Sequence, residues 1–204
     1  MKSEKILEAI RFSFEVHSNQ YRKGTQIPYI SHPLAVASLV LDNGGTETEF
    51  IAALLHDAVE DGNGEITAKE IKEKFSDEVE NIVKDCSDTD IKPKPPWRER
   101  KMLHIKHASI ASDSAKLVMA ADKLHNIRSI ISDYKIHGED LWQRFNAPKE
   151  DILWYYRSMI NALICGKTKL ILRELRRLIN ELEVEVASTG PSMNNTEQRA
   201  EYYR

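Results

Sequence analysis

Residues 51–61 read Ile-Ala-Ala-Leu-Leu-His-Asp-Ala-Val-Glu-Asp, an apolar run that leads directly into a group of ionisable side chains. The apolar spacing predicts a buried helix over 47–61, and the glycines Gly62 and Gly64 are typical of a helix end. A histidine and three carboxylates beside such a hydrophobic turn cost free energy unless a partner compensates for them. This stretch therefore predicts both an element of a helical core and a chemically special position within it.

The charges themselves indicate what such a partner is. On a continuous helix His56 lies over Glu60, and Asp57 lies over Asp61. The carboxylates of the second pair repel each other unless a cation or a proton lies between them. Imidazole together with carboxylate is a ligand set for Mn, Fe, Co or Zn rather than for Ca. We therefore expect a divalent transition metal near His56 and Asp57.

Two residues elsewhere in the chain are candidates to complete the metal site. His32 stands near a predicted helix start, and Asp122 interrupts an otherwise apolar helix. Each also has a simpler interpretation, because His32 fits a helix cap and Asp122 fits a buried ion pair with Lys123. Likewise, Glu60 at a helix end before a glycine fits a solvated surface turn.

Helical periodicity extends over most of the remaining sequence. We predict helices over 3–19, 31–42, 47–61, 67–75, 77–86, 97–107, 114–134, 149–165 and 168–186. Ser31 is the expected N-cap of the second helix, and Thr67 with Glu70 fits a capping box. Three prolines exclude regular structure from residues 87–96. No segment alternates in the manner of a strand, so the fold class predicted is all-α.

Length and composition narrow the class of protein further. The chain has 204 residues, 41% of them hydrophobic, and a formal net charge of −3. This size predicts one domain over 1–187, followed by a polar, flexible tail over 188–204. The near-neutral charge argues against binding to a nucleic acid polymer.

The sequence also indicates the compartment. No apolar run approaches the roughly 20 residues that a membrane helix needs, and the N-terminal residues contain scattered charges instead of the hydrophobic block of a secretory signal. Two cysteines, Cys86 and Cys165, are too few for a disulfide framework and fit reduced, buried thiols. We therefore expect a cytoplasmic protein with no membrane partner. Composition leaves open whether it forms a homo-oligomer.

A basic segment over 92–101 contains five cations and one acid. Guanidinium and ammonium groups suit phosphate, so Arg98 and Lys101 are candidates to bind a phosphorylated ligand. A solvated helix start, with Trp97 as a packing residue, explains the segment equally well. The aromatic residues of 141–157 fit either a pocket wall or ordinary core.

Several stretches together resemble a known family. They are Tyr-Arg-Lys-Gly at 21–24, Ile-Pro-Tyr-Ile-Ser-His-Pro at 27–33, Leu-Leu-His-Asp-Ala-Val-Glu-Asp at 54–61 and Ala-Asp-Lys-Leu-His-Asn-Ile-Arg at 121–128. Their order and spacing are similar to those of the hydrolase domain of RelA/SpoT-type alarmone enzymes, a branch of the HD-domain metallohydrolases. The likeness covers about residues 5–135 and is strongest to the small, stand-alone alarmone hydrolases. It implies a compact multi-helix HD-domain bundle.

The resemblance also implies roles for individual residues. Family members remove the 3′-pyrophosphate from guanosine tetra- or pentaphosphate, giving GDP or GTP and pyrophosphate. One Mn²⁺ ion would be held by His32, His56, Asp57 and Asp122. Glu60 and Asp61 would position and deprotonate the attacking water. The nucleotide substrate would be bound by Arg22, which stacks on the base, by Lys23, which meets phosphate, and by Asn126, with Ser129 close by.

Other functions are compatible with the same residues. An HD-type phosphohydrolase could release single phosphates, or act on an adenine alarmone or on NADPH. A non-catalytic nucleotide-binding module is a third interpretation. The costly buried charges of the full residue set argue against that last alternative.

Overall fold

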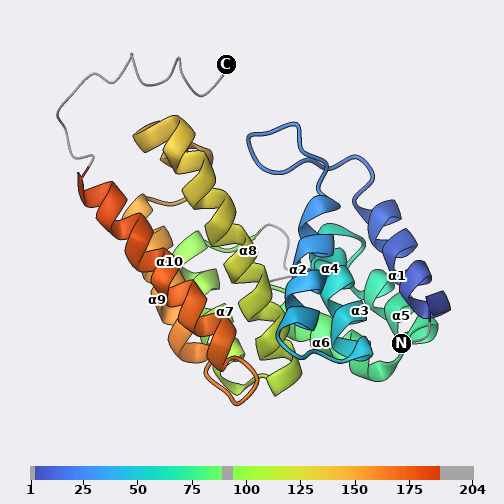
Figure 1. Ribbon diagram of the computed structural model, residues 1–204. Coiled ribbons are helices and arrows are strands. Elements are labelled where there is room, and N and C mark those ends of the chain that lie inside the picture. The colour runs from blue at the N-terminus through green and yellow to red at the C-terminus, as the bar shows by residue number, and fades with distance from the viewer. Residues whose placement is uncertain (1–2, 89–93, 189–204) are drawn as a thin grey trace.

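The computed structural model describes residues 3–88 and 94–188, and in this part of the chain the regular structure is helical (Figure 1). Its only β feature there is an isolated bridge between Tyr21 and Pro28. The elements are α1 (Ser3–Val16), α2 (Ser31–Asp42), α3 (Glu47–Leu55), α4 (Ala58–Asp61), α5 (Glu65–Lys74), α6 (Asp77–Cys86), α7 (Trp97–Ile110), α8 (Asp113–His137), the 3₁₀ helix η1 (Gly138–Arg144), α9 (Lys149–Ala162) and α10 (Lys169–Ser188). The all-α prediction is confirmed.

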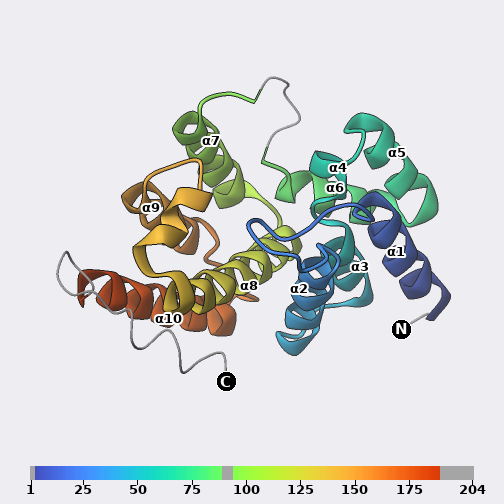
Figure 2. The ribbon, with the colours of Figure 1, turned by 90° about the horizontal axis from the view of Figure 1, so that it is seen from above.

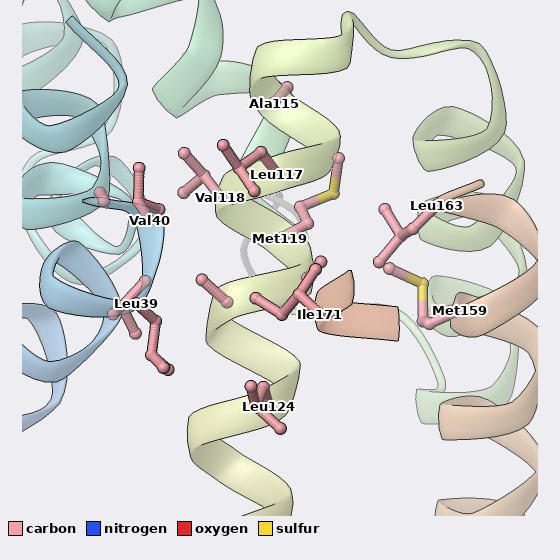
Figure 3. Packing of buried hydrophobic residues seen from close by; sticks show 14 of the residues in the cluster. Leu39, Val40, Ala115, Leu117, Val118, Met119, Leu124, Met159, Leu163 and Ile171 are labelled. Atoms are coloured by element: carbon pink, nitrogen blue, oxygen red, sulfur yellow. The ribbon is translucent and has the colours of Figure 1, made fainter. Parts of the chain in front are cut away.

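Helix α8 lies at the centre of the molecule. In Figure 2 it runs between a group formed by α1–α6 and a second group formed by α7, α9 and α10. Residues 117–121 are all buried, which is the pattern of a helix that packs on every side. Figure 3 shows Leu39 and Val40 of α2 on one side of α8, and Met159 of α9 with Leu163 on the other. Asp122 follows directly on this apolar stretch and is only 8% exposed.

The predicted helix over 47–61 is wrong in one important respect, because it is two helices. Helix α3 ends at Leu55, and α4 begins at Ala58. The His56 Nδ1 lies 2.8 Å from the Ala53 carbonyl oxygen, which the backbone N–H of residue 57 would bond in a continuous helix. Asp57 has φ −97° and ψ −4°, in the sparsely populated bridge region. The chain therefore turns at two of the residues predicted to bind the metal.

Two predicted caps differ from the structure. Ser31 is the first residue of α2, and its N-cap is Ile30, which makes no side-chain cap bond. Thr67 lies inside α5, where its Oγ1 accepts a hydrogen bond from the Asn63 N–H at 2.9 Å. A capping box does occur at the start of α3, because the Thr46 side chain bonds the Glu49 N–H and the Glu49 side chain bonds the Thr46 N–H. Thr46 and Glu49 have the same spacing as Thr67 and Glu70, so they fit the capping-box pattern equally well.

Other predicted boundaries move by a few residues. Helix α8 continues to His137 because no helix-breaking residue precedes Gly138, whose φ is +55°. The irregular structure predicted for 87–96 holds where it is described, and 89–93 lie outside the described residues. Of the predicted tail, Ser188 is the last residue of α10, and the rest lies outside the described part. Both cysteines are free thiols, but they are half-buried rather than buried. No helix among the described residues has the length and apolarity to span a bilayer.

Candidate active site

A pocket of about 340 Å³ lies beside the middle of α8. Its wall comes from the loop before α2, the start of α2, the α3–α4 junction, the end of α6, α7, α8 and α9. Among the site residues predicted from sequence, those that line it are Arg22, Lys23, His32, Asp57, Glu60, Lys101, Asp122 and Asn126. Segments distant in the sequence therefore converge on one cavity.

Three side chains meet the distance requirement for holding a metal ion, and two of them, His32 and Asp57, line this pocket, while His56 lies behind its wall. His32, His56 and Asp57 each offer a ligand atom, and these atoms lie within 4.8 Å of one another. The His56 Nε2 lies 2.9 Å from Asp57 Oδ2, and the His32 Nε2 lies 3.6 Å from the same oxygen. Both histidines are almost fully buried, at 1% and 2% exposure. Because the helix is interrupted at residues 56 and 57, the side chains of these adjacent residues point toward the same place.

The hydrogen bonds of His56 fit a metal ligand. Its Nδ1 faces a carbonyl oxygen, which can only accept, so the ring hydrogen lies on Nδ1 and Nε2 carries a lone pair. That Nε2 is buried and donates no hydrogen bond in this tautomer, although Asp57 Oδ2 lies 2.9 Å away. Burial opposes the charged ring, but the carboxylates of Asp57 and Asp122 raise the pKa of His56 to about 9. A positive charge is therefore favoured here, and a proton or a divalent cation can supply it.

Asp122 fits both of its sequence-based interpretations. Its Oδ2 accepts a hydrogen bond from Lys123 Nζ at 2.5 Å, which is the expected ion pair. Its Oδ1 lies 3.2 Å from His32 Nε2 and 3.9 Å from His56 Nε2, so the other oxygen faces the histidines. Although burial opposes ionisation, Lys123 and His32 hold the pKa of Asp122 well below its usual range. Asp122 is thus a charged carboxylate at the edge of the cluster.

The two carboxylates of α4 point to different places. Glu60 lines the pocket, where its Oε1 accepts from Lys94 Nζ at 2.6 Å and its Oε2 accepts from the Asp88 N–H at 3.3 Å. Asp61 is not among the lining residues, and its Oδ2 lies 3.7 Å from His17 Nδ1. Partial burial and the nearby Asp57 and Glu60 carboxylates raise the pKa of Asp61 to about 6.

The residues predicted to bind nucleotide are mostly at the pocket. Arg22 donates from Nη2 to Asn126 Oδ1 at 2.7 Å, and Asn126 in turn donates to Asp122. Lys23 Nζ lies 3.5 Å from Asn146 Oδ1. Ser129 is not a lining residue, since its hydroxyl donates to the His125 carbonyl oxygen one turn earlier at 3.2 Å.

The basic segment over 92–101 fits both of its interpretations in part, because Lys101 lines the pocket and Arg98 lies on the exposed surface. Arg98 is exposed and does not line the pocket. It pairs with Asp151 instead, and its guanidinium carbon lies 3.6 Å from the centre of the Trp154 ring. Three residues further along α7, Lys101 lines the pocket and donates to Asp88 Oδ2 at 3.1 Å. Lys92 lies outside the described residues. Residues three apart on a helix share a face only approximately, so packing decides which of them reaches the cavity.

Sequence reasoning assigned no role to Tyr29, which the structure brings to the site. Tyr29 donates its hydroxyl hydrogen to Asp57 Oδ2 at 2.6 Å. Partial burial and the Asp57 carboxylate raise the pKa of Tyr29, so the hydroxyl stays protonated as a donor. The aromatic segment over 141–157 divides between its two interpretations, because Phe145 and Asn146 line the pocket beside Lys23 whereas Trp142 is buried in the core. The Pro-Tyr pair in the 27–33 stretch was a signal for Tyr29.

Comparison with known proteins identifies the family. A family model described as HD domain matches residues 9–153. The guanosine-3′,5′-bis(diphosphate) 3′-pyrophosphohydrolase MESH1 of Xenopus tropicalis is 47% identical over 128 residues, which cover 61% of this chain and 69% of that protein. The Homo sapiens MESH1 is 37% identical over 132 residues, covering 63% of this chain and 71% of that protein.

A solved structure extends the likeness beyond those segments. It is described as a metazoan ortholog of SpoT that hydrolyses ppGpp, and it matches with a TM-score of 0.72 at 26% identity. The match covers 89% of this chain and 97% of the other. The family model, these relatives and the helical packing around the His/Asp cluster all indicate the same family. This chain belongs to the HD-domain family, within the group that contains the MESH1 proteins.

Proposed function

We propose that this protein is a divalent-metal-dependent hydrolase that removes the 3′-pyrophosphate from guanosine tetra- or pentaphosphate, giving GDP or GTP and pyrophosphate. The observation that carries the proposal is a cluster of the buried His32 and His56 with the half-buried Asp57, beside a pocket lined with cations. The relatives named above act on this class of substrate by their descriptions. Lys23 and Lys101, which both line the pocket, suit a ligand with several phosphates.

The metal would be held by His32, His56, Asp57 and Asp122, and among Mn, Fe, Co and Zn we propose Mn²⁺. A divalent ion there supplies Lewis-acid stabilisation of phosphoryl charge and acidifies water. Tyr29 supports this set by holding one oxygen of Asp57 through its hydroxyl. Lys123 does the same for Asp122 from the neighbouring position of α8.

Glu60 is the proposed general base. Its carboxylate lines the pocket on the same short helix that follows Asp57, so it is positioned to take a proton from the attacking water. The water oxygen bonds to phosphorus while the bond from phosphorus to the ribose 3′ oxygen breaks. That oxygen takes a proton from solvent, and Glu60 returns the proton it accepted to solvent. The sequence prediction gives Asp61 a share in positioning and deprotonating this water, and we propose that it assists Glu60, with Asp57, Glu60 and His17 around it.

The nucleotide would be bound by other residues of the pocket lining. Arg22 and Phe145 offer flat surfaces for a base, and Lys23 and Lys101 offer ammonium groups for phosphates. Asn126 links Arg22 to Asp122, and therefore joins the proposed binding and metal residues. We also keep as predictions a domain over 1–187, a cytoplasmic location, and no nucleic acid polymer or membrane as partner.

A substrate panel tests the proposal. Mn²⁺-loaded protein is incubated with ppGpp, pppGpp, their adenine analogues, NADPH and plain nucleotides, and the products are resolved by ion-exchange chromatography. We expect pyrophosphate and GDP or GTP from the guanosine alarmones. Orthophosphate as the product would indicate a single-phosphate phosphohydrolase, and preferred turnover of an adenine nucleotide or NADPH would correct the substrate. Binding without turnover of any compound would indicate a non-catalytic module.

Arg22→Ala should raise KM for ppGpp about tenfold or more and lower kcat much less. The reason is that a guanidinium bound to a non-reacting part of the substrate contributes equally to ground and transition states. Steady-state kinetics measures both constants, with Arg11→Ala on the exposed face of α1 as the control. An unchanged KM together with a reduced kcat would contradict a binding role for Arg22.

A further inference from the structure

His125 is a half-buried residue of α8 to which the proposed reaction assigns no role. Its Nδ1 lies 2.8 Å from the Nδ1 of His32, in the range of a direct hydrogen bond between the rings. The ring centroids are 4.9 Å apart, with planes tilted by 35°. His32 is 1% exposed, so this contact lies inside the protein next to the His/Asp cluster.

A hydrogen bond between two imidazole nitrogens needs one hydrogen, and its place matters for His32. The His32 Nε2 faces the carboxylates, 3.2 Å from Asp122 Oδ1 and 3.6 Å from Asp57 Oδ2. If this nitrogen is to offer a lone pair to a cation, the ring hydrogen must lie on Nδ1. His125 Nδ1 is then the acceptor, and its own hydrogen is on Nε2.

His56 offers a comparison within the same cluster. Its Nδ1 faces the Ala53 carbonyl oxygen at 2.8 Å, an acceptor that cannot become a donor. The backbone therefore sets the tautomer of His56, whereas a side chain sets that of His32. One of the two histidines depends on a residue that can be substituted without changing the main chain.

We infer that His125 is a positioning residue for the metal centre, because its Nδ1 accepts the hydrogen of His32 Nδ1 and so holds His32 in the tautomer and orientation that bind a divalent cation. This inference rests on the proposed function, since it takes His32 as a ligand. Partners of this kind on ligating histidines typically change metal affinity by about 10- to 100-fold. His125 touches neither the reacting atoms nor the cation in this role.

Two substitutions of similar size isolate the hydrogen bond. In His125→Asn the amide oxygen takes the place of Nδ1 relative to the β-carbon and can accept from His32, whereas His125→Leu places a methyl group there. Metal-free protein is titrated with Mn²⁺, and the free ion is followed by its electron paramagnetic resonance signal. We expect the leucine variant to bind Mn²⁺ about 10- to 100-fold more weakly and the asparagine variant to stay within about threefold of wild type.

Controls separate this effect from a loss of folding and from the proposed reaction. His107→Leu, on the exposed face of α7, should leave Mn²⁺ affinity unchanged, and the thermal unfolding midpoints of both metal-free His125 variants should match each other. Equal affinity for the leucine variant and wild type, or equally weak binding by both His125 variants, would overturn the inference, as would wild-type protein that binds no Mn²⁺. Wild-type protein that binds Mn²⁺ but leaves ppGpp intact would overturn the proposed function while the affinity comparison still decides the role of His125.

Discussion

Replacing Asp57 with alanine should abolish metal uptake and hydrolysis together. The Asp57 carboxylate faces both buried histidines, with Oδ2 at 2.9 Å from His56 Nε2 and at 3.6 Å from His32 Nε2. Without it, two neutral rings and Asp122 remain, which is too little negative charge to hold a divalent ion firmly. Because Lewis-acid stabilisation and an acidified water are lost together, we expect hydrolysis of ppGpp to fall by about 10³-fold or more. Mn²⁺ titration and the rate of pyrophosphate formation, measured on the same sample, check both effects.

The substitution also removes the acceptor of the Tyr29 hydroxyl, so folding needs its own control. Asp57→Asn keeps an oxygen for Tyr29 and removes only the charge, and it should show the same loss of metal and activity. Asp85→Ala, a carboxylate on α6 that pairs with His107, should behave like wild type. A fully active, metal-loaded Asp57→Ala protein would show that Asp57 is no ligand.

Glu60→Gln should separate chemistry from metal binding. The amide has the shape of the carboxylate but cannot accept a proton, so kcat should fall by about 10²- to 10⁴-fold. Mn²⁺ affinity should remain within a few-fold of wild type, because Glu60 lines the pocket without being part of the His32, His56 and Asp57 cluster. Single-turnover measurements at saturating ppGpp and Mn²⁺ report the chemical step directly.

Two comparisons make this prediction specific. Asp61→Asn should reduce kcat less than Glu60→Gln, because Asp61 faces His17 and is not a lining residue of the pocket. Glu65 is an exposed residue of α5, and Glu65→Gln should leave both kcat and Mn²⁺ affinity unchanged. An unchanged rate in Glu60→Gln would remove Glu60 from the proposed mechanism, and a greater loss in Asp61→Asn would move the base to that residue.

Much of the fold was predictable because local chemistry is sufficient for helices. Apolar residues at steps of three and four, with glycines and prolines between them, placed α2 and α6 at their observed bounds. The break between α3 and α4 was not predictable in this way. It accompanies a contact of the His56 ring with a backbone carbonyl, and a periodic pattern of apolar residues contains no information about such a contact.

The candidate site was likewise predictable in part from the sequence and in part only from the tertiary structure. The motif residues His32, His56, Asp57 and Asp122 were identifiable in the sequence because buried charges are costly and rarely occur without a partner. Which side chains reach the pocket is a tertiary property: Lys101 lines it, while Arg98 on the same helix pairs with Asp151. The contacts of Tyr29 with Asp57 and of His125 with His32 likewise join residues 28 and 93 positions apart. Spacing along one helix predicts a face, but only the packing of several helices against α8 determines which atoms come within hydrogen-bond distance.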